Sequence, residues 1–272
     1  MKFLESEVIN RDSPRGHVNV KSASSSGELA LISSSELPER RAFSRSLNYW
    51  KERMAISSGK KGSKVLEIWG RNNSVNVQKV LWSCDELGVS FHRYDVGGPF
   101  GGNREPEYLA RNPTGLVPTI SDNGFALWES NTIVRYLSAK HGAGSLWSEN
   151  PEARALADKW MDYQLGTIWP AFRTAFLGLT RTPPEERDPA AIRASLESTA
   201  EAWAIVDAHL EDHEYIAGSS FTMGDVPLGP TAYRWLNIDI ERPLMPNLEA
   251  WHARLCSRPA YQANVMVPFT FT

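Results

Sequence analysis

The sequence has few cysteines: Cys84 and Cys256 are the only two among 272 residues. They lie far apart and match neither a CxxC motif nor the spacing of metal ligands, which excludes a disulfide scaffold and a structural zinc site. The N-terminus also lacks an apolar signal segment, so we expect a reducing, cytoplasmic setting. Cys84 lies on the apolar stripe of a predicted helix, and we expect it to be a buried packing residue.

Long hydrophobic runs and excess positive charge are absent as well. No apolar run approaches the roughly 20 residues that span a membrane, so we expect no membrane partner. The net charge of -3 provides no general attraction to phosphate backbones, which argues against nucleic acid. Hydrophobic residues make up 42% of the chain and charged residues 22%, near the averages for globular proteins, and 272 residues are enough for two domains.

The first 63 residues contain few apolar side chains and two serine clusters, at residues 24–26 and 33–35. Such a composition predicts a disordered or weakly helical leader. One stretch differs: Phe43, Leu47, Trp50 and Met54 recur at helical spacing among basic residues. That stretch is interpreted either as a transient helix or as a docking helix for a partner or an anionic surface. Met54 is also a candidate start of the native protein, which leaves open whether residues 1–53 belong to it.

Residues 64–142 predict a mixed α/β domain. Short β-rich runs at residues 65–69 and 91–96 flank a helical pattern that ends at Gly88, and a short helix is predicted at residues 106–111. Strands at residues 117–120 and 125–128 are joined by a turn at residues 121–124 that contains Asn-Gly, a strong hairpin signal. A further helix follows from Ser130 to Gly142. The predicted order is β-α-β-α-β-β-α.

Residues 150–267 carry helical periodicity without strand signals, which predicts an all-helical second domain. Its clearest stripe consists of Ile192, Leu196, Thr199, Trp203, Val206 and Leu210. Thr222 and Asp225 have the spacing of a capping box, and Phe221 and Val226 are placed to form a hydrophobic staple. We expect this box to begin a helix.

Two segments of the chain resemble the cytosolic glutathione transferases. NPTGLVP, residues 112–118, is similar to the family's NPxGxVP segment, and WESNTIVRYL, residues 128–137, is similar to its ESxxIxxYL segment. The resemblance covers about three quarters of the chain and implies a thioredoxin-like domain followed by an all-helical domain. The loop and helix start NNSVNVQKV, residues 72–80, look most like bacterial members that use serine or asparagine.

The resemblance implies a glutathione site. Val117–Pro118 looks like the family's cis-proline turn, which would expose the Val117 N–H and C=O to the cysteinyl backbone of glutathione. Ser130 would hold the γ-glutamyl carboxylate and Glu129 its ammonium, at a strand-to-helix junction where the helix dipole favours a carboxylate. Ser130 is also a plain helix cap, and the two roles are compatible.

The residue that contacts the glutathione sulfur is predicted to be Ser74 or Asn76. Ser74 aligns with the hydroxyl that many members use and is the first choice, whereas Asn76 aligns with an asparagine that others use. Each is also a good helix cap, so purely structural roles stay open. Trp69 stands at the end of the first strand, where other members have a tyrosine, and the loop contains no cysteine.

The partner of the glycyl carboxylate is left open. Leu116 stands where many relatives carry a lysine that helps to hold glutathione. Asn103, Arg104 and Lys79 are alternative candidates for this contact.

The electrophile is expected between the sulfur and the helical domain. Candidate pocket residues are Trp169, Phe172, Arg173 and Phe176, although aromatic residues at helical spacing also pack in cores. No metal is required. The resemblance favours conjugation of glutathione to a small electrophile by a homodimer that joins one subunit's first domain to the other's second. A glutathione-dependent disulfide or peroxide reductase, and a non-catalytic dimeric glutathione-binding protein, are the alternatives.

Overall fold

The computed structural model describes residues 65–269, all of which belong to one compact unit. The predicted leader, with its basic amphipathic stretch, lies outside the described residues. Within the described part, no helix is long and apolar enough to cross a membrane.

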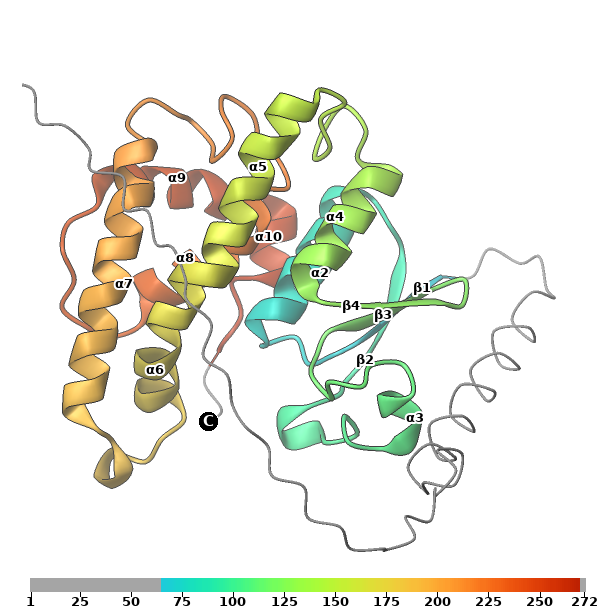
Figure 1. The fold of residues 1–272 in the computed structure, drawn as a ribbon, viewed down its shortest axis with the longest axis horizontal. Helices are drawn as coiled ribbons and strands as arrows, with labels where there is room; N and C mark the ends of the chain where they lie inside the picture. Colours follow the sequence, from blue (N-terminus) through green and yellow to red (C-terminus); the bar gives the residue numbers. More distant parts are fainter. Residues whose placement is uncertain (1–64, 270–272) are drawn as a thin grey trace, which may run out of the picture. The chain divides into compact units, whose positions relative to one another are not determined.

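A four-stranded sheet organises the first half of the described chain (Figure 1). Its strands are β1 (Leu66–Trp69), β2 (Phe91–Tyr94), β3 (Thr119–Asp122) and β4 (Phe125–Trp128), in the spatial order β2-β1-β3-β4. The β1–β2 pair is parallel because a helix connects the two strands, and the other two pairs are antiparallel. With α2 (Val75–Glu86), α3 (Pro106–Leu109) and α4 (Ser130–His141), this order confirms the thioredoxin-like prediction.

The β3–β4 hairpin differs in detail from the prediction. β3 begins at Thr119, because the two residues before it form the Val117–Pro118 cis peptide that the resemblance implied. The turn contains two residues rather than four. Asn123 and Gly124 both have positive φ angles, 53° and 91°, which suits a tight hairpin turn and explains the Asn-Gly pair.

Helices α2 and α4 bury the apolar face of the sheet. Ile68 and Ile120 of the sheet, Val80 of α2 and Ile133 of α4 have no exposed surface and belong to one core cluster. Cys84 is buried in the same cluster, as predicted, and burial raises the pKa of its thiol far above the ordinary value. This thiol is therefore a packing group.

The second half of the described chain is helical, as predicted. Its elements are α5 (Pro151–Tyr163), the π-helical turn η2 (Gln164–Ile168), α6 (Trp169–Thr180), the short 3₁₀ turn η3 (Pro184–Glu186), α7 (Pro189–His209), α8 (Asp225–Asn237), α9 (Pro246–Cys256) and α10 (Pro259–Asn264). A further 3₁₀ turn, η1 (Gly98–Phe100), follows β2. Figure 1 shows α2 and α4 on the side of the sheet that faces these helices.

Helix α2 joins the two halves. Its Trp82 has no exposed surface and packs edge-on against Tyr261 of α10, with ring centroids 4.8 Å apart. Gly229 of α8 lies directly against the Trp82 ring, because a Cβ at this position would stand 2.6 Å from a ring carbon. The absent side chain lets α8 approach α2.

One of the two reciprocal hydrogen bonds of the predicted capping box forms. The Asp225 carboxylate accepts the backbone N–H of Thr222 at 2.9 Å, but the Thr222 hydroxyl accepts the N–H of Gly224 rather than that of Asp225. The same carboxylate accepts the backbone N–H of Ile216 and the indole N–H of Trp251. Asp225 therefore holds together the chain before α8, the start of α8, and α9.

Candidate active site

The segment at residues 112–118 is held in shape by its own side chains. The Asn112 amide donates to the Leu116 carbonyl at 2.9 Å and to the Thr119 hydroxyl at 3.0 Å, while its oxygen accepts the Thr114 N–H at 3.0 Å. Asn112 is 1% exposed, so these bonds are shielded from water. They fix the backbone leading to the cis peptide between Val117 and Pro118.

The junction between β4 and α4 places Glu129 and Ser130. Glu129 has a φ of 70°, a conformation that side chains other than glycine rarely adopt, and its side chain is exposed. Ser130 is the first residue of α4 and is buried. The free N–H groups of a helix start attract a carboxylate, so this corner is suited to an amino-acid head group.

A small pocket brings most of the predicted site residues together. Its walls are formed by Asn76, Asn112, Thr114, Leu116, Val117, Pro118, Trp128, Glu129 and Ser130. Thus the cis-proline segment, the Glu129–Ser130 corner and Asn76 of α2 face one cavity. Ser74 is not among the lining residues.

Ser74 and Asn76 stand at the start of α2. Ser74 occupies the N-cap position, yet its side chain makes no capping hydrogen bond, and it is 8% exposed. Its backbone N–H donates to the Arg71 carbonyl at 3.2 Å and its carbonyl accepts from the N–H of Gln78 at 2.9 Å. The backbone here is fixed while the hydroxyl is not used as a cap.

The comparisons with known proteins agree with this geometry. The models for "Glutathione S-transferase, N-terminal domain" and "Glutathione S-transferase, C-terminal domain" match residues 73–140 and 189–254. Glutathione S-transferase GstB of Escherichia coli K12 is 43% identical over 206 residues, which are 75% of this chain and 99% of that relative. The chain belongs to the glutathione S-transferase family. The transferase assignment made from the sequence is therefore confirmed.

Solved structures of other transferases have the same fold. The glutathione-bound theta class enzyme of Xanthomonas axonopodis pv. citri superposes with a TM-score of 0.74 at 49% identity, covering 76% of this chain and 99% of that one. Glutathione transferase F2 of Populus trichocarpa gives a TM-score of 0.68 over 74% of this chain and 97% of that one. At 24% identity, the poplar protein supports the fold alone.

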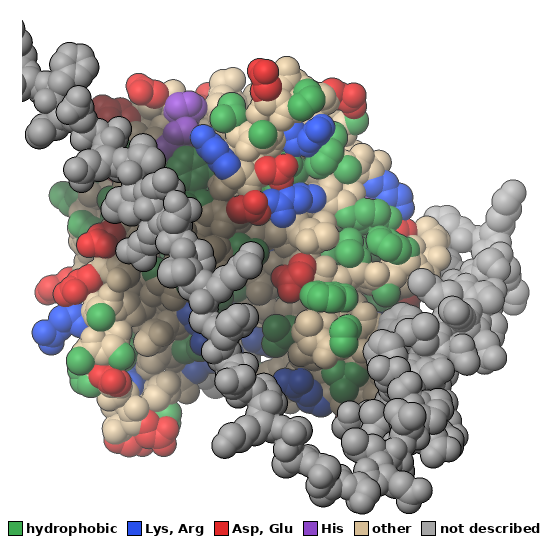
Figure 2. Space-filling view, viewed as in Figure 1, with side chains coloured by type: hydrophobic (Ala, Val, Ile, Leu, Met, Phe, Trp, Pro, Cys, Tyr) green, Lys and Arg blue, Asp and Glu red, His purple; other side chains and the backbone are tan. Residues whose placement is uncertain are grey.

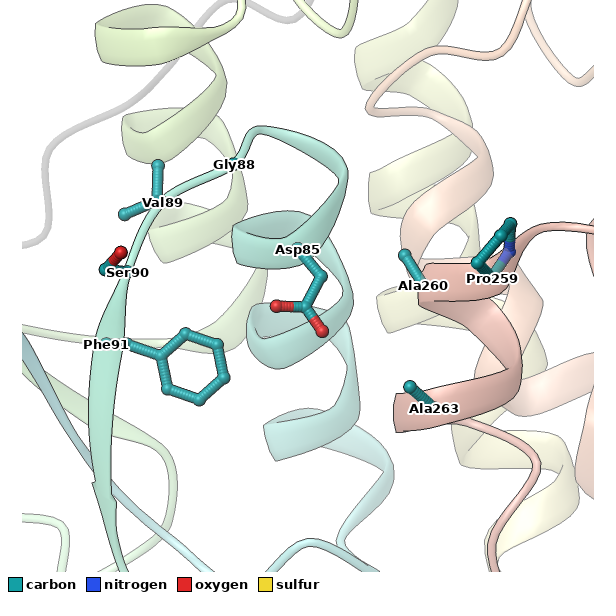
Figure 3. Close-up of a pocket in the computed structure, with 8 residues that line it drawn as sticks. All are labelled: Asp85, Gly88, Val89, Ser90, Phe91, Pro259, Ala260 and Ala263. Atoms are coloured by element: carbon teal, nitrogen blue, oxygen red, sulfur yellow. The ribbon is translucent and has the colours of Figure 1, made fainter.

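A second hollow of this transferase lies at the other end of α2 (Figure 3). It is lined by Asp85, Gly88, Val89, Ser90, Phe91, Pro259, Ala260 and Ala263. Its one charged group, the Asp85 carboxylate, already accepts a hydrogen bond from the Asn264 amide at 2.6 Å. None of the predicted site residues borders this hollow.

The three candidates for the glycyl carboxylate have different surroundings. Lys79 is fully buried, and its ammonium donates to the side-chain oxygens of Asn131 in α4 at 3.1 Å and Gln164 in η2 at 2.9 Å, so it lies between α4 and the helical domain. Asn103 donates to the Gly115 carbonyl at 2.7 Å and thus supports the pocket loop. Arg104 is exposed and lies against Gly115, where a Cβ would stand 2.6 Å from its Nη1.

The four residues predicted for the electrophile pocket differ in their burial. Phe172 has no exposed surface and packs edge-on against Trp235 with ring centroids 5.6 Å apart, so it is a core residue rather than part of a pocket wall. Phe176 is 3% exposed and packs beside Phe172. Trp169 is half-buried and Arg173 is exposed. Phe172 and Phe176 point inward because they share the apolar stripe of α6.

One residue that the sequence did not indicate contacts the backbone next to the predicted sulfur site. Arg234 of α8 donates to the backbone carbonyl of Asn73, immediately before Ser74, at 3.0 Å. The two residues are 161 positions apart, and Arg234 stands in no motif. Only the fold brings them together.

Proposed function

We propose that the pocket beside the cis-proline segment binds glutathione. The backbone N–H and C=O of Val117 would pair with the cysteinyl residue, Ser130 would hold the γ-glutamyl carboxylate, and Glu129 its ammonium. The observation that carries this proposal is the single pocket lined by Val117, Pro118, Glu129, Ser130 and Asn76. The theta class relative from Xanthomonas, whose structure contains glutathione, is 49% identical.

The glutathione thiolate would form at the start of α2. An unperturbed thiol has a pKa of about 8.5, and lowering it by two units requires about 2.7 kcal/mol of stabilisation of the anion. One hydroxyl that donates to an anion supplies roughly 1.5–3 kcal/mol, and the positive end of a helix adds roughly 0.3–1 kcal/mol. The unused Ser74 hydroxyl is suited to this role, with the Asn76 side chain in the pocket wall as the alternative donor.

Isothermal titration calorimetry tests the binding proposal. We expect glutathione to bind the purified protein. Glu129→Gln and Ser130→Ala should each weaken binding by about tenfold, since the first removes the negative charge beside the ammonium and the second removes a hydrogen bond to the carboxylate. A protein that releases no heat with glutathione, or variants that bind as tightly as the parent, would disprove this placement.

Arg104 is the proposed partner of the glycyl carboxylate, because it is the exposed cation beside the pocket loop. Its role is tested with glutathione and with the ethyl ester of its glycyl carboxylate, which lacks that negative charge. Arg104→Gln should weaken binding of glutathione but not of the ester. Equal losses for the two ligands would assign Arg104 a role in supporting the loop.

The second substrate would be a small electrophile that reaches the sulfur from the helical domain, with half-buried Trp169 and exposed Arg173 as candidate wall residues. Turnover with a panel of aryl halides, epoxides, hydroperoxides and mixed disulfides identifies its class. Rates with Arg173→Ala that equal the parental rates would remove Arg173 from the pocket.

A homodimer in the cytoplasm is the proposed working form. Figure 2 shows hydrophobic side chains gathered on the visible face of the molecule near β4 and α4. Phe125 of β4 is 47% exposed and packs on Tyr136 of α4, with ring centroids 5.4 Å apart. Tyr136 is half-buried, and an exposed phenylalanine supported in this way is suited to an interface between subunits. Cys84 and Cys256 are both free thiols, in keeping with a reducing compartment.

A further inference from the structure

Two cations are buried where α2 meets the helical domain. Lys79 of α2 and Arg234 of α8 are 0% and 1% exposed. Within residues 65–269 neither forms an ion pair with a carboxylate, and their hydrogen-bond partners are neutral oxygens of side chains and backbone. Burying a charge without an opposite charge is costly, so neither residue is explained by stability alone.

Arg234 binds the chain on both sides of Ser74. Its Nη2 donates to the Asn73 carbonyl at 3.0 Å, and its Nη1 donates to the Gln78 side-chain oxygen at 2.7 Å and to the Pro230 carbonyl of its own helix at 2.8 Å. The Asn73 carbonyl and the Ser74 N–H belong to one planar peptide group. Arg234 holds the oxygen of this group, while the Arg71 carbonyl accepts its N–H.

The rigid fork of a guanidinium explains why an arginine occupies this position. It donates in two directions at fixed angles, to a loop carbonyl and to a side chain one turn into α2, whereas an ammonium is a single point of charge. Burial lowers the pKa of Arg234 to about 9, so the fork stays charged at neutral pH. The hydrogen bonds of this fork are therefore charge-assisted at neutral pH.

We infer that Arg234 is a positioning residue through which the helical domain fixes the peptide before Ser74, and hence the group that stabilises the glutathione thiolate. This inference depends on the proposed sulfur site at Ser74 or Asn76. Arg234 does not border the glutathione pocket, so it affects the position of the sulfur's partner and not the binding of the tripeptide. Small displacements of a positioned group cause large losses of rate.

A matched control lies at the opposite end of α2. Arg258, at the N-cap of α10, donates to both carboxylate oxygens of Glu86, at 2.8 Å and 2.6 Å, and so also ties α2 to the helical domain. It lies beyond the C-terminal part of α2, far along the helix from Ser74. Loss of this tether would reduce stability without moving the sulfur site.

The experiment compares Arg234→Lys and Arg258→Lys by steady-state kinetics across pH at saturating glutathione. For Arg234→Lys we expect kcat to fall by about tenfold or more, the KM for glutathione to stay within about twofold, and the midpoint of the kcat pH profile to rise by about half a unit. Arg258→Lys should keep the parental kcat and midpoint, even if its Tm falls. If Arg234→Lys does not fold, Gln78→Met removes one of the acceptors, and a smaller change in the same direction is expected.

Three outcomes are decisive. Arg234→Lys, or Gln78→Met in its place, with the parental kcat and midpoint would overturn the inference. Equal losses in the Arg258 variant would overturn it too, because they would show a general effect of loosening the interface. If the parent protein itself binds no glutathione by calorimetry, the proposed function fails. If the parent binds glutathione and its kcat shows a pH-dependent midpoint, a negative result for the variants contradicts only the role of Arg234.

Discussion

Ser74 combines a fixed backbone with a hydroxyl that does not cap its own helix. An N-cap serine usually gives its oxygen to the first turn, so a hydroxyl without this bond is available to donate to an incoming anion. Asn76, two residues further on, contributes to the pocket wall. The two side chains are therefore distinct candidates that substitution can separate.

We predict that Ser74→Ala raises the apparent pKa of bound glutathione by at least about one unit, because one charge-assisted hydrogen bond of roughly 1.5–3 kcal/mol is lost. Asn76→Ala should have the smaller effect. The measurement is the thiolate absorbance of the complex as a function of pH. A larger shift in the Asn76 variant would assign the sulfur contact to the amide.

Lys79 makes stability depend on pH. Burial first, and then the positive charge of Arg234, lower its pKa to about 7 from the ordinary 10.5. Between these values the unfolded chain binds a proton that the folded chain lacks, so the free energy of unfolding increases with pH. Below the folded pKa the lysine is protonated in both states and this dependence ends.

We predict that urea unfolding of the parent protein shows a stability that increases from about pH 7 to about pH 8.5, and that Lys79→Met removes most of this slope. This window lies below the pKa of about 9 that burial gives Arg234, whose own contribution therefore begins later. A slope that is unchanged in Lys79→Met would mean that the buried ammonium keeps its ordinary pKa.

Local sequence patterns predicted the helices, strands and turns whose signal is contained in a few neighbouring residues. The strand, helix and hairpin order and the stripe of α7 followed from periodicity and turn residues. Strand ends did not: β3 starts after Pro118 because the backbone of residues 117–118 turns into the site instead of pairing with β1. Likewise, the spacing of Thr222 and Asp225 indicated a helix start, but not the distant donors that also bind this carboxylate.

We predict that Asp225→Ala destabilises the protein by about 3 kcal/mol or more, because it leaves the buried N–H of Ile216, the buried indole of Trp251 and the partly buried N–H of Thr222 without an acceptor. Asp225→Asn should cost less, since the amide oxygen can still accept. Urea unfolding of the two variants measures the difference. An equal cost for both would mean that the charge of the carboxylate matters more than its hydrogen bonds.

At the scale of the whole described molecule, the contacts between the two domains are the part that the sequence could not provide. Lys79 with Gln164, Gln78 with Arg234, and Glu86 with Arg258 join residues 85, 156 and 172 positions apart. In the sequence alone, each of these polar residues is typical of a solvent-exposed helix face. Their partners are identified only when α2 packs between the sheet and the helical region. The same packing brings Arg234 to the Asn73 carbonyl, next to the proposed sulfur site.

The exposed aromatic side chain on β4 leads to a prediction about assembly. If Phe125 lies in the subunit interface, sedimentation of the parent protein should give about twice the 30.4 kDa subunit mass, and Phe125→Glu should give a monomer, because it places a charge in an apolar contact. Ile205→Glu, at a residue of α7 that is 56% exposed, is compared with it. Because the expected interface joins the first domain of one subunit to the second domain of the other, a dimer that persists in Ile205→Glu would place Ile205 outside the interface. A monomeric parent at micromolar concentration would contradict the homodimer, whereas a dimer that persists in Phe125→Glu would move the interface to another face.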